Sequence, residues 1–375
     1  MDQLERKINR KNLVCLSFNN LKNHRTMTDA ISYNNVHNLF KLNGFHLNRN
    51  DLCRVAYSFI KEGEEFEKAF GDFILDWFDA KPYLEMNTSG TTGTPKVIRI
   101  EKQAMVNSAI ATGDFFDLKP GDKALHCLPT KYIAGKMMFV RSFILGLDID
   151  FVAPSSHPLL DNNCKYDFVA MVPLQAQNSL SELENVKKVI IGGAKVNNVL
   201  EKALSKLKTK VYETYGMTET ITHIAAKQVG AEAFSVLPNV KIAMDDRNCL
   251  VIDAPKISKG SIVTNDLVAL IGENQFVFLG RMDNIINSGG IKLIPEKIEA
   301  KLSHKIHARF FVAGLQDIDL GEKLALIIEG EEQVLEDTIF EGLDKYEKPK
   351  EIFYVAKFTE TENGKIKRKE IVEGI

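Results

Sequence analysis

Residues 87–96, with the sequence NTSGTTGTPK, have the composition of a loop that binds phosphate. Glycines allow successive backbone N–H groups to turn toward one centre, and such a concave nest binds anions. Serine and threonine hydroxyls add hydrogen-bond donors, and Lys96 supplies a positive charge at the end of the stretch. A flexible Ser/Gly/Thr linker is the alternative, but linkers rarely combine so many threonines with a Pro-Lys exit into a strand.

The spacing of this loop differs from that of the Walker nucleotide loop, G-x-x-x-x-G-K-[ST], which leads into a helix. Counting from Gly90 places Pro95 where the Walker motif has its second glycine. The next segment, KVIRI (96–100), alternates apolar and polar residues as a strand does, and PYLEM (82–86) before the loop is a second strand candidate. We therefore expect a phosphate loop between two strands, and this excludes the kinase and GTPase classes that use the Walker loop.

Two further segments place chemical groups directly after predicted strands. YETYGMTET (212–220) brings an aromatic residue, a glycine, a hydroxyl and a carboxylate together at a strand end. A lone Thr-Glu pair is most often a helix start, so only this wider context suggests a site. In IIGGAKV (190–196), two glycines permit close approach of the backbone to a ligand, although an ordinary turn at a strand end is the alternative.

The elements between and after these segments predict the fold. Residues 51–80 have apolar side chains at helical spacing, and helices are also predicted over 101–116, 132–147 and 197–206. Strands are predicted at 123–128, 147–153, 166–172, 187–193 and 210–216. Because strands alternate with helices, we expect layered α/β structure with a largely parallel sheet.

The pattern changes twice toward the C-terminus. After about residue 225, short segments of alternating apolar and polar residues predict a small β-rich subdomain. After Arg281, residues 284–375 have their own α+β pattern, with helices expected at 296–304 and 331–343. We place a domain boundary near Asp283, which gives a large domain over 1–282 and a small one over 283–375.

Composition excludes several broad classes. The chain has 375 residues, of which 45% are apolar and 26% charged, as in ordinary soluble proteins, and its net charge of −2 gives no electrostatic case for nucleic acid or an anionic membrane. We expect no membrane insertion, because no run of 18 or more apolar residues occurs, and no signal peptide, because the charged N-terminus is not followed by an apolar region. The five cysteines are widely spaced, which favours reduced thiols and a cytoplasmic protein.

The loop resembles the phosphate loop of the adenylate-forming (AMP-binding) superfamily, which includes acyl-CoA synthetases, luciferases and adenylation domains. The motifs that follow it resemble the other signature motifs of that superfamily and occur in the same order. The resemblance covers Asn87 to the C-terminus and implies that superfamily's fold with a shortened N-terminus and a small mobile C-terminal domain. It also implies ATP and Mg²⁺ as cofactors and coenzyme A as the thiol substrate. A homodimer is left open.

The resemblance implies roles for the residues of each motif. In the phosphate loop the implied nucleotide-binding residues are Thr88, Ser89, Gly90, Thr91, Thr92, Gly93 and Lys96. Gly193 and Ala194 are expected to lie along the adenine, with Tyr215, Gly216 and Met217 following in the next motif. Tyr215 is expected to stack on adenine, Thr218 to hydrogen-bond the α-phosphate, and Glu219 to hold Mg²⁺ through oxygen ligation.

The C-terminal motifs imply the remaining roles. Asp266, in TNDLVAL, is expected to accept hydrogen bonds from the ribose, and Asn265 stands where the family usually has glycine. Asn tolerates a left-handed backbone better than most residues, so the turn can be kept. In GRMDNIINSGGIKLIPEKIE, Arg281 is expected to reach ribose or phosphate, Asp283 to be the hinge, and Gly289-Gly290 to face coenzyme A. In ENGKIKRKEI, Lys365 is expected to contact the carboxylate and the α-phosphate.

The implied reaction has two steps: the substrate carboxylate attacks the α-phosphate of Mg·ATP, and a thiol then displaces AMP. Within the superfamily, the chain most resembles o-succinylbenzoate–CoA ligases of menaquinone biosynthesis. The likeness rests on the shortness of the chain and on three segments: LPTKYIAGKMMFVRSF, YGMTETITHIA and INSGGIKLIPEKIE. The acid pocket is expected to include Gly216, Ile221 and Tyr132, the last standing where many relatives have histidine. Lys136 and Arg141 lie on one predicted helix and are expected to bind a second carboxylate, with snorkelling at the helix edge as the alternative.

Other interpretations of the sequence remain open. An acyl-CoA ligase for another aryl or fatty acid and a stand-alone adenylation domain that loads a carrier protein share the motifs. A non-catalytic homologue is disfavoured because Glu219, Arg281 and Lys365 are all present.

Overall fold

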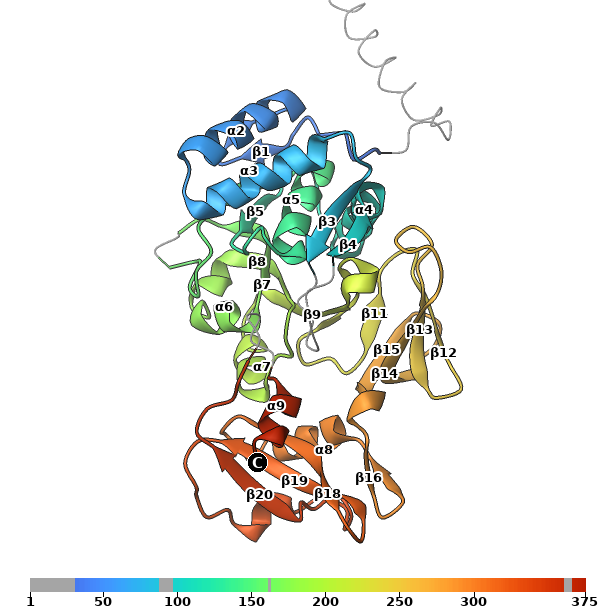
Figure 1. Ribbon diagram of the computed structural model, residues 1–375. Helices are drawn as coiled ribbons and strands as arrows, with labels where there is room; N and C mark the ends of the chain where they lie inside the picture. Colours follow the sequence, from blue (N-terminus) through green and yellow to red (C-terminus); the bar gives the residue numbers. More distant parts are fainter. Residues whose placement is uncertain (1–30, 88–96, 161–162, 361–365) are drawn as a thin grey trace, which may run out of the picture.

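The computed structural model of the chain describes residues 31–87, 97–160, 163–360 and 366–375 (Figure 1). The predicted phosphate-loop residues 88–96 and Lys365 therefore lie outside the described residues. Within the described part, no helix is long and apolar enough to span a membrane.

Five parallel strands form the middle of the large sheet, in the spatial order β9-β8-β7-β5-β6. Alternate residues of each strand point to opposite faces, so the sheet has two apolar cores. Phe168 and Ile190 belong to one core, whereas their neighbours Val169 and Val189 belong to the other. The strands are β5 (Lys123–His126), β6 (Asp148–Phe151), β7 (Tyr166–Met171), β8 (Val186–Ile191) and β9 (Lys210–Gly216).

Helices cover both faces of this sheet, as the alternating sequence pattern predicts. One face packs against α2 (Arg49–Glu62), α3 (Glu65–Phe78), α4 (Lys102–Phe116) and α5 (Ile133–Leu145). The other packs against α6 (Pro173–Asn178) and α7 (Asn198–Leu204). The first core is rich in aromatic contacts: the Phe139 ring lies 4.2 Å from Phe70 and 4.1 Å from His126, measured between ring centroids.

The helical segment predicted over 51–80 is two helices. Gly63 ends α2 in an extended conformation, and a Cβ there would lie 2.6 Å from the Phe59 carbonyl oxygen. The next helix, α3, begins after Glu64, whose backbone N–H donates to the Glu67 carboxylate at 2.8 Å. The apolar spacing was helical on both sides of Gly63, so the pattern alone did not reveal the break.

Antiparallel strands extend the sheet beyond β9. The hydrogen-bonded order continues as β9-β10-β11-β15-β14-β13-β12, so the predicted β-rich subdomain is joined to the parallel strands through β10 and β11. Its own apolar core includes Leu250, Val268 and Phe276. These strands are β10 (His223–Gln228), β11 (Phe234–Val236), β12 (Lys241–Met244), β13 (Cys249–Asp253), β14 (Ile262–Leu270) and β15 (Gln275–Arg281). At the opposite edge, the short strands β1 (Lys41–Leu42) and β2 (Phe45–His46) follow β6.

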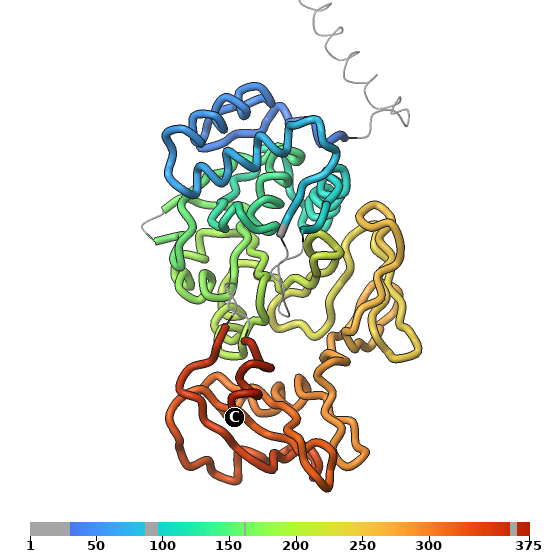
Figure 2. Tube along the Cα trace, viewed as in Figure 1, coloured from blue at the N-terminus to red at the C-terminus, as the bar shows by residue number. Residues whose placement is uncertain are grey.

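A separate sheet follows a 3₁₀ turn, η3 (Met282–Asn284). It is covered on one face by α8 (Pro295–Leu302) and on the other by α9 (Arg368–Glu373), each side with its own apolar cluster. The tube trace in Figure 2 shows this unit as the orange and red part of the chain. Asp283 lies within η3, and the domain boundary expected there stays a prediction. The strands are β16 (Ile286–Ser288), β17 (Ile291–Leu293), β18 (Phe310–Asp317), β19 (Gly321–Glu329) and β20 (Glu351–Val355).

The helix expected over 331–343 is wrong: only the short 3₁₀ turn η4 (Asp337–Phe340) forms there. Val334 is 98% exposed, so the segment does not bury a continuous apolar face. The segment also carries five acidic residues and no basic residue, and like charges one turn apart disfavour a helix.

Candidate active site

The predicted phosphate loop joins the two strands of a hairpin. β3 (Tyr83–Asn87) pairs antiparallel with β4 (Val97–Glu101), with Asn87 opposite Val97 at the loop end. This confirms the expectation of a strand on each side of residues 88–96, whereas a helix follows the loop in a Walker motif. After β4 the chain enters α4 directly at Lys102.

Two of the other predicted motifs, 190–196 and 212–220, lie at the carboxyl ends of the parallel strands β8 and β9, and open α/β sheets bind ligands at such ends. Gly192 follows β8 and its N–H donates to the Met171 carbonyl at the end of β7, at 3.1 Å. Gly193 has a φ of +88°, a left-handed conformation that glycine adopts without strain. Ala194 follows on the same loop, half-buried.

Gly216 ends β9 at a point where no larger residue fits. It lies opposite His223 of the antiparallel strand β10, and a Cβ on Gly216 would lie 2.4 Å from the Thr222 carbonyl oxygen. Because that atom belongs to the backbone, it cannot move aside as a side chain would. The glycine of the YGMTET segment is thus required by the close approach of two strands.

A strained turn carries the hydroxyl and carboxylate that follow Gly216. Thr218 and Glu219 lie on the 3₁₀ turn η2 (Thr218–Thr220) and are exposed. Ile221 has φ +66° and ψ −54°, and the Thr222 N–H donates to the Thr220 carbonyl at 2.7 Å. This is a γ-turn of the rarer, strained form, here at a β-branched residue. Strain of this kind clusters at functional sites.

The hydroxyl of Thr220 stabilises this turn from inside. It accepts a hydrogen bond from the Met217 N–H at 2.9 Å, and it lies 2.7 Å from the Thr222 carbonyl oxygen. Ile221 itself is buried, so the turn directs Thr218 and Glu219 outward while Ile221 packs into the apolar core of the α2–α5 face.

Tyr215 and Asp266 form one unit. The Tyr215 hydroxyl donates to the Asp266 carboxylate, and the Tyr215 ring packs against Phe276 with centroids 5.1 Å apart. Burial, and then the Asp266 charge, raise the pKa of the Tyr215 hydroxyl far above its ordinary value. The tyrosine therefore stays a neutral donor that orients Asp266. Stacking of the ring on adenine stays a prediction.

Arg281 lies between two carboxylates. Its Nε is 3.6 Å from Asp266 Oδ1 and its Nη2 is 3.2 Å from Asp283 Oδ2. Arg281 and Asp283 are about half exposed. The left-handed turn expected at Asn265 is wrong, because Asn265 lies within strand β14 and is not among the described residues with positive φ.

Arg141 and Lys136 do not converge, although both lie on α5. Arg141 is almost fully buried, and its Nη2 lies 3.2 Å from Thr222 Oγ1 and 3.4 Å from His223 Nδ1. Lys136 faces α3 instead, with its ammonium 5.0 Å from the centre of the Phe73 ring. Burial lowers the pKa of Lys136, and the carboxylates of Asp76 and Asp72 oppose that shift.

Arg141 is charged in an unusual setting. Burial lowers the pKa of its guanidinium to about 10, and no carboxylate pairs with it among the described residues. Burial, and then the Arg141 charge, also lower the pKa of His223 well below its ordinary value, which keeps that ring neutral. Thr222 and His223 are contacts that the sequence did not predict, because only the packing of α5 against β10 brings them to Arg141.

The remaining predicted residues lie nearby or in the C-terminal unit. Tyr132 precedes α5 as its N-cap, half-buried. Gly289 and Gly290 form the left-handed turn between β16 and β17, with φ values of +58° and +81°. The N–H of Gly289 donates to the Leu320 carbonyl at 2.8 Å. Their approach to coenzyme A stays a prediction.

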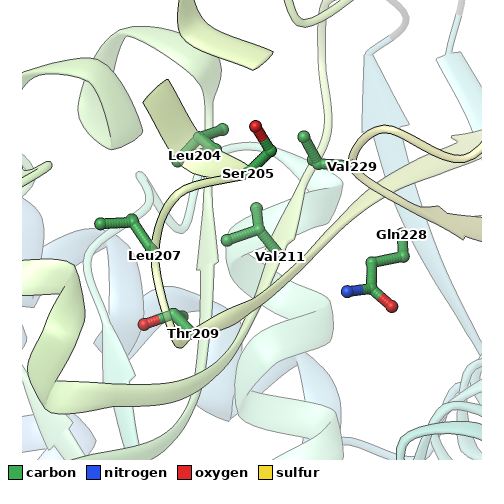
Figure 3. A pocket seen from close by; sticks show the side chains of 7 residues that line it. All are labelled: Leu204, Ser205, Leu207, Thr209, Val211, Gln228 and Val229. Carbon is green, nitrogen blue, oxygen red and sulfur yellow. The ribbon is translucent and has the colours of Figure 1, made fainter. Parts of the chain in front are cut away.

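A hollow of about 60 Å³ lies at the opposite end of β9 (Figure 3). It is lined by apolar and polar side chains, among them Leu204, Val211, Thr209 and Gln228. It lies at the amino end of β9, away from Gly216, and it is far smaller than a nucleotide-binding pocket. We do not assign it to the site.

Comparison with known proteins agrees with this geometry. The profile of the family named AMP-binding enzyme matches residues 77–261. An acyl-CoA synthetase (AMP-forming)/AMP-acid ligase II-like protein from Dyadobacter fermentans is 34% identical, with a TM-score of 0.57, over 83% of this chain and 95% of that one. The chain belongs to the AMP-binding enzyme family and has the fold of its adenylate-forming members.

Two further relatives are more distant. A 2-succinylbenzoate–CoA ligase from Listeria innocua is 26% identical over 80% of this chain and 72% of its own length. The o-succinylbenzoate coenzyme A synthetase from Bacillus subtilis, solved with ATP and a magnesium ion, has a TM-score of 0.67 at 22% identity, over 76% of this chain and 69% of that one.

Proposed function

We propose that this chain is an AMP-forming acid–CoA ligase whose acid is 2-succinylbenzoate. The observation that carries the choice of acid is Arg141, a buried guanidinium without a carboxylate partner among the described residues. An isolated buried charge is costly, and a carboxylate is the group that best compensates a guanidinium. An acid with a second carboxylate supplies that partner, whereas a fatty acid does not.

The reaction has two steps because a carboxylate does not react directly with a thiol. Its oxygen is a poor leaving group, so it first attacks the α-phosphorus of ATP and pyrophosphate departs. The thiol of coenzyme A then attacks the acyl carbon and AMP departs. No general base is needed in the first step, because the carboxylate is already ionised at pH 7. The protein has to position the reactants and stabilise the negative charge that gathers near phosphorus.

The site residues divide this work by position. Thr218, exposed beside the strained turn, would bind the α-phosphate together with Lys365, and residues 88–96 would hold the β- and γ-phosphates. Asp266, oriented by Tyr215, would accept the ribose hydroxyls, with Arg281 beside it. Gly193 and Ala194 would lie along the adenine.

Glu219 fits the Mg²⁺ that accompanies ATP. Its carboxylate is an exposed oxygen ligand, and Mg²⁺ in nucleotide sites typically takes one or two carboxylates together with phosphates and water. Bound there, the ion would neutralise charge on the phosphate oxygens.

The second step would use a different orientation of the C-terminal unit. We propose residues 1–282 and 283–375 as the two domains, with rotation about Asp283. Lys365 would leave the site, and the Gly289-Gly290 turn would approach the thiol. A change of this kind is a hinge closure that a few residues absorb.

The test of the acid is a screen for pyrophosphate release in the presence of ATP, Mg²⁺ and coenzyme A. We expect 2-succinylbenzoate to be the best substrate. Two matched analogues lack one carboxylate each: 4-oxo-4-phenylbutanoate lacks the ring carboxylate, and 2-butanoylbenzoate lacks the chain carboxylate. Equal or faster turnover of a monocarboxylic analogue would contradict the choice of acid, and a carrier-protein thiol preferred over coenzyme A would contradict the choice of thiol.

A further inference from the structure

Asn265 makes contacts that link the β-rich subdomain to the connection between the two sheets. Its Nδ2 donates to both carboxylate oxygens of Asp283, at 3.1 and 3.3 Å. Its Oδ1 accepts from Arg247 Nη1 at 3.1 Å. This orientation of the amide is the one that chemistry allows, because the reverse would place its oxygen against a carboxylate and its NH₂ against a guanidinium.

Arg247 is itself held in place. It forms an ion pair with Asp245 at 2.7 Å, and its Nη2 donates to the Thr264 carbonyl at 3.2 Å. Asp245 in turn accepts from the Cys249 N–H at 2.9 Å, in the turn between β12 and β13. The amide of Asn265 therefore lies between a fixed guanidinium and the carboxylate of Asp283.

Asp283 lies in η3, the turn that connects β15 of the large sheet to β16 of the small one (Figure 1). Its neighbour Asn284 is held from the other side: Asn284 Nδ2 donates to Glu296 Oε1 of α8 at 2.6 Å. Consecutive residues of the connection are thus tied to opposite units, Asp283 to β14 and Asn284 to α8. A rotation that changes the backbone angles of η3 has to move at least one of these side chains off its partner.

We infer that Asn265 is a positioning residue that holds Asp283 in the orientation seen here and so sets the balance between the two orientations of the C-terminal unit. The catalytic consequence of this inference rests on the proposed two-step function. Glycine at this position has no donor for Asp283, and aspartate would repel it. The side chain of Asp283 is 52% exposed, so the hydrogen bond contributes modestly, enough to shift a balance but not to prevent rotation.

The first test needs no substrate and measures hydrogen exchange of the Ile285 amide, which donates to the Met282 carbonyl within η3. We expect exchange in Asn265→Ala to be roughly three- to tenfold faster than in the wild type, and faster still in Asn265→Asp. The matched control is Gln275→Ala, which removes an exposed hydrogen bond to Ser235 in the same subdomain without touching η3. The inference would be overturned if Ile285 exchanged at the wild-type rate in all three variants. It would also be overturned if exchange accelerated equally in Asn265→Ala and in the control Gln275→Ala.

The second test separates positioning from folding. Adenylate formation and thioester formation from supplied acyl-adenylate are measured for each variant, and we expect their ratio to change in Asn265→Ala but not in Gln275→Ala. In an Asp283→Ala background, Asn265→Ala should change neither Ile285 exchange nor the ratio, because its partner is gone. An additional effect in that background would overturn the inference.

The results of these tests distinguish a failure of the inference about Asn265 from a failure of the proposed function. If Ile285 exchange accelerates as expected but no acid is adenylated, the inference about Asn265 stands and the proposed function fails. If the chain is an active ligase but exchange and ratio are unchanged in Asn265→Ala, the proposed function stands and the inference fails.

Discussion

Arg141 Nη2 lies 3.2 Å from Thr222 Oγ1, so the middle of α5 is tied to the residue that follows the strained turn at Ile221. The same nitrogen lies 3.4 Å from His223 Nδ1. A buried guanidinium therefore contacts the two residues that follow the turn carrying Thr218 and Glu219. Any substrate carboxylate that reaches Arg141 is bound on the inner side of the predicted phosphate-binding turn.

We first predict that Arg141→Ala raises the KM for the acid roughly 10- to 100-fold and leaves the KM for ATP within a few-fold of the wild type. The reason is the loss of the charge-assisted hydrogen bond that we propose between Arg141 and the second carboxylate of the acid. Steady-state kinetics with each substrate varied in turn measures the split. An unchanged KM for the acid rules out Arg141 as the residue that binds that carboxylate.

The matched variant for Arg141 is Lys136→Ala, because Lys136 lies on the same helix but faces Phe73 of α3. We expect it to change the KM for the acid much less than Arg141→Ala does. Arg141→Lys is a useful companion, since it keeps the charge but not the planar fork of donors, and it should recover only part of the affinity.

The contrast between these two residues shows what the sequence could predict. The helix itself was predicted correctly, and a period of 3.6 residues places positions five apart about 140° from each other, so the sequence already contained the reason that Lys136 and Arg141 diverge. The contact of Arg141 with Thr222 and His223 could not be predicted, because it depends on how α5 packs against β10. Asn265 is similar: the sequence suggested a turn, whereas tertiary pairing places it in β14.

Local chemistry was predicted more completely than tertiary contacts. The sequence predicted the strands on both sides of residues 88–96 and the strand that ends at Gly216. These predictions follow from turn and strand patterns that act over a few residues. The failure over residues 331–343 has the opposite cause: apolar residues were present, but nothing in their spacing showed that Val334 would stay exposed.

The second prediction concerns Lys365. Lys365→Ala should reduce adenylate formation by more than about 100-fold, because a positioned cation near the α-phosphate acts where negative charge gathers. Thioester formation from supplied acyl-adenylate should change little, because the proposed rotation of the C-terminal unit takes Lys365 out of the site before that step. Pyrophosphate release and thioester formation are measured separately, and equal loss in both contradicts the rotation about Asp283.

The third prediction concerns the loop between β3 and β4. Thr91→Ala and Thr92→Ala should each slow adenylate formation about tenfold, because in the proposed function each hydroxyl donates to the β- or γ-phosphate. Those phosphates leave as pyrophosphate, so thioester formation from supplied acyl-adenylate should be nearly unaffected. If the two steps slow alike, the loop serves more than the departing phosphates.

The fourth prediction concerns Gly216. Gly216→Ala places a Cβ 2.4 Å from the Thr222 carbonyl oxygen, so β9 and β10 have to separate. We expect the free energy of unfolding to fall by about 1–3 kcal/mol and adenylate formation to fall with it. Gly260→Ala is the matched control, because a Cβ there meets nothing within 4 Å and its φ is not positive. A chemical denaturation midpoint that moves equally in both variants would contradict the close approach of the two strands.

The last prediction is a loss of stability in acid caused by His126. Burial lowers the pKa of this ring from 6.5 to about 4, so between these values the unfolded chain binds a proton that the folded chain does not. Stability is therefore fully present above pH 6.5 and is lost as the pH falls toward 4, with about 2 kcal/mol lost by pH 5.

The test variant is His126→Phe, which keeps an aromatic ring beside Phe139 but cannot titrate. This variant should have a lower urea midpoint than the wild type at pH 7.5, because the Gly135 carbonyl loses its contact with His126 Nε2 at 3.1 Å. The difference between its urea midpoints at pH 7.5 and pH 5 should nevertheless be smaller than that of the wild type. If the variant loses as much stability as the wild type between these pH values, His126 is not the group responsible, and the buried His223 becomes the residue to test.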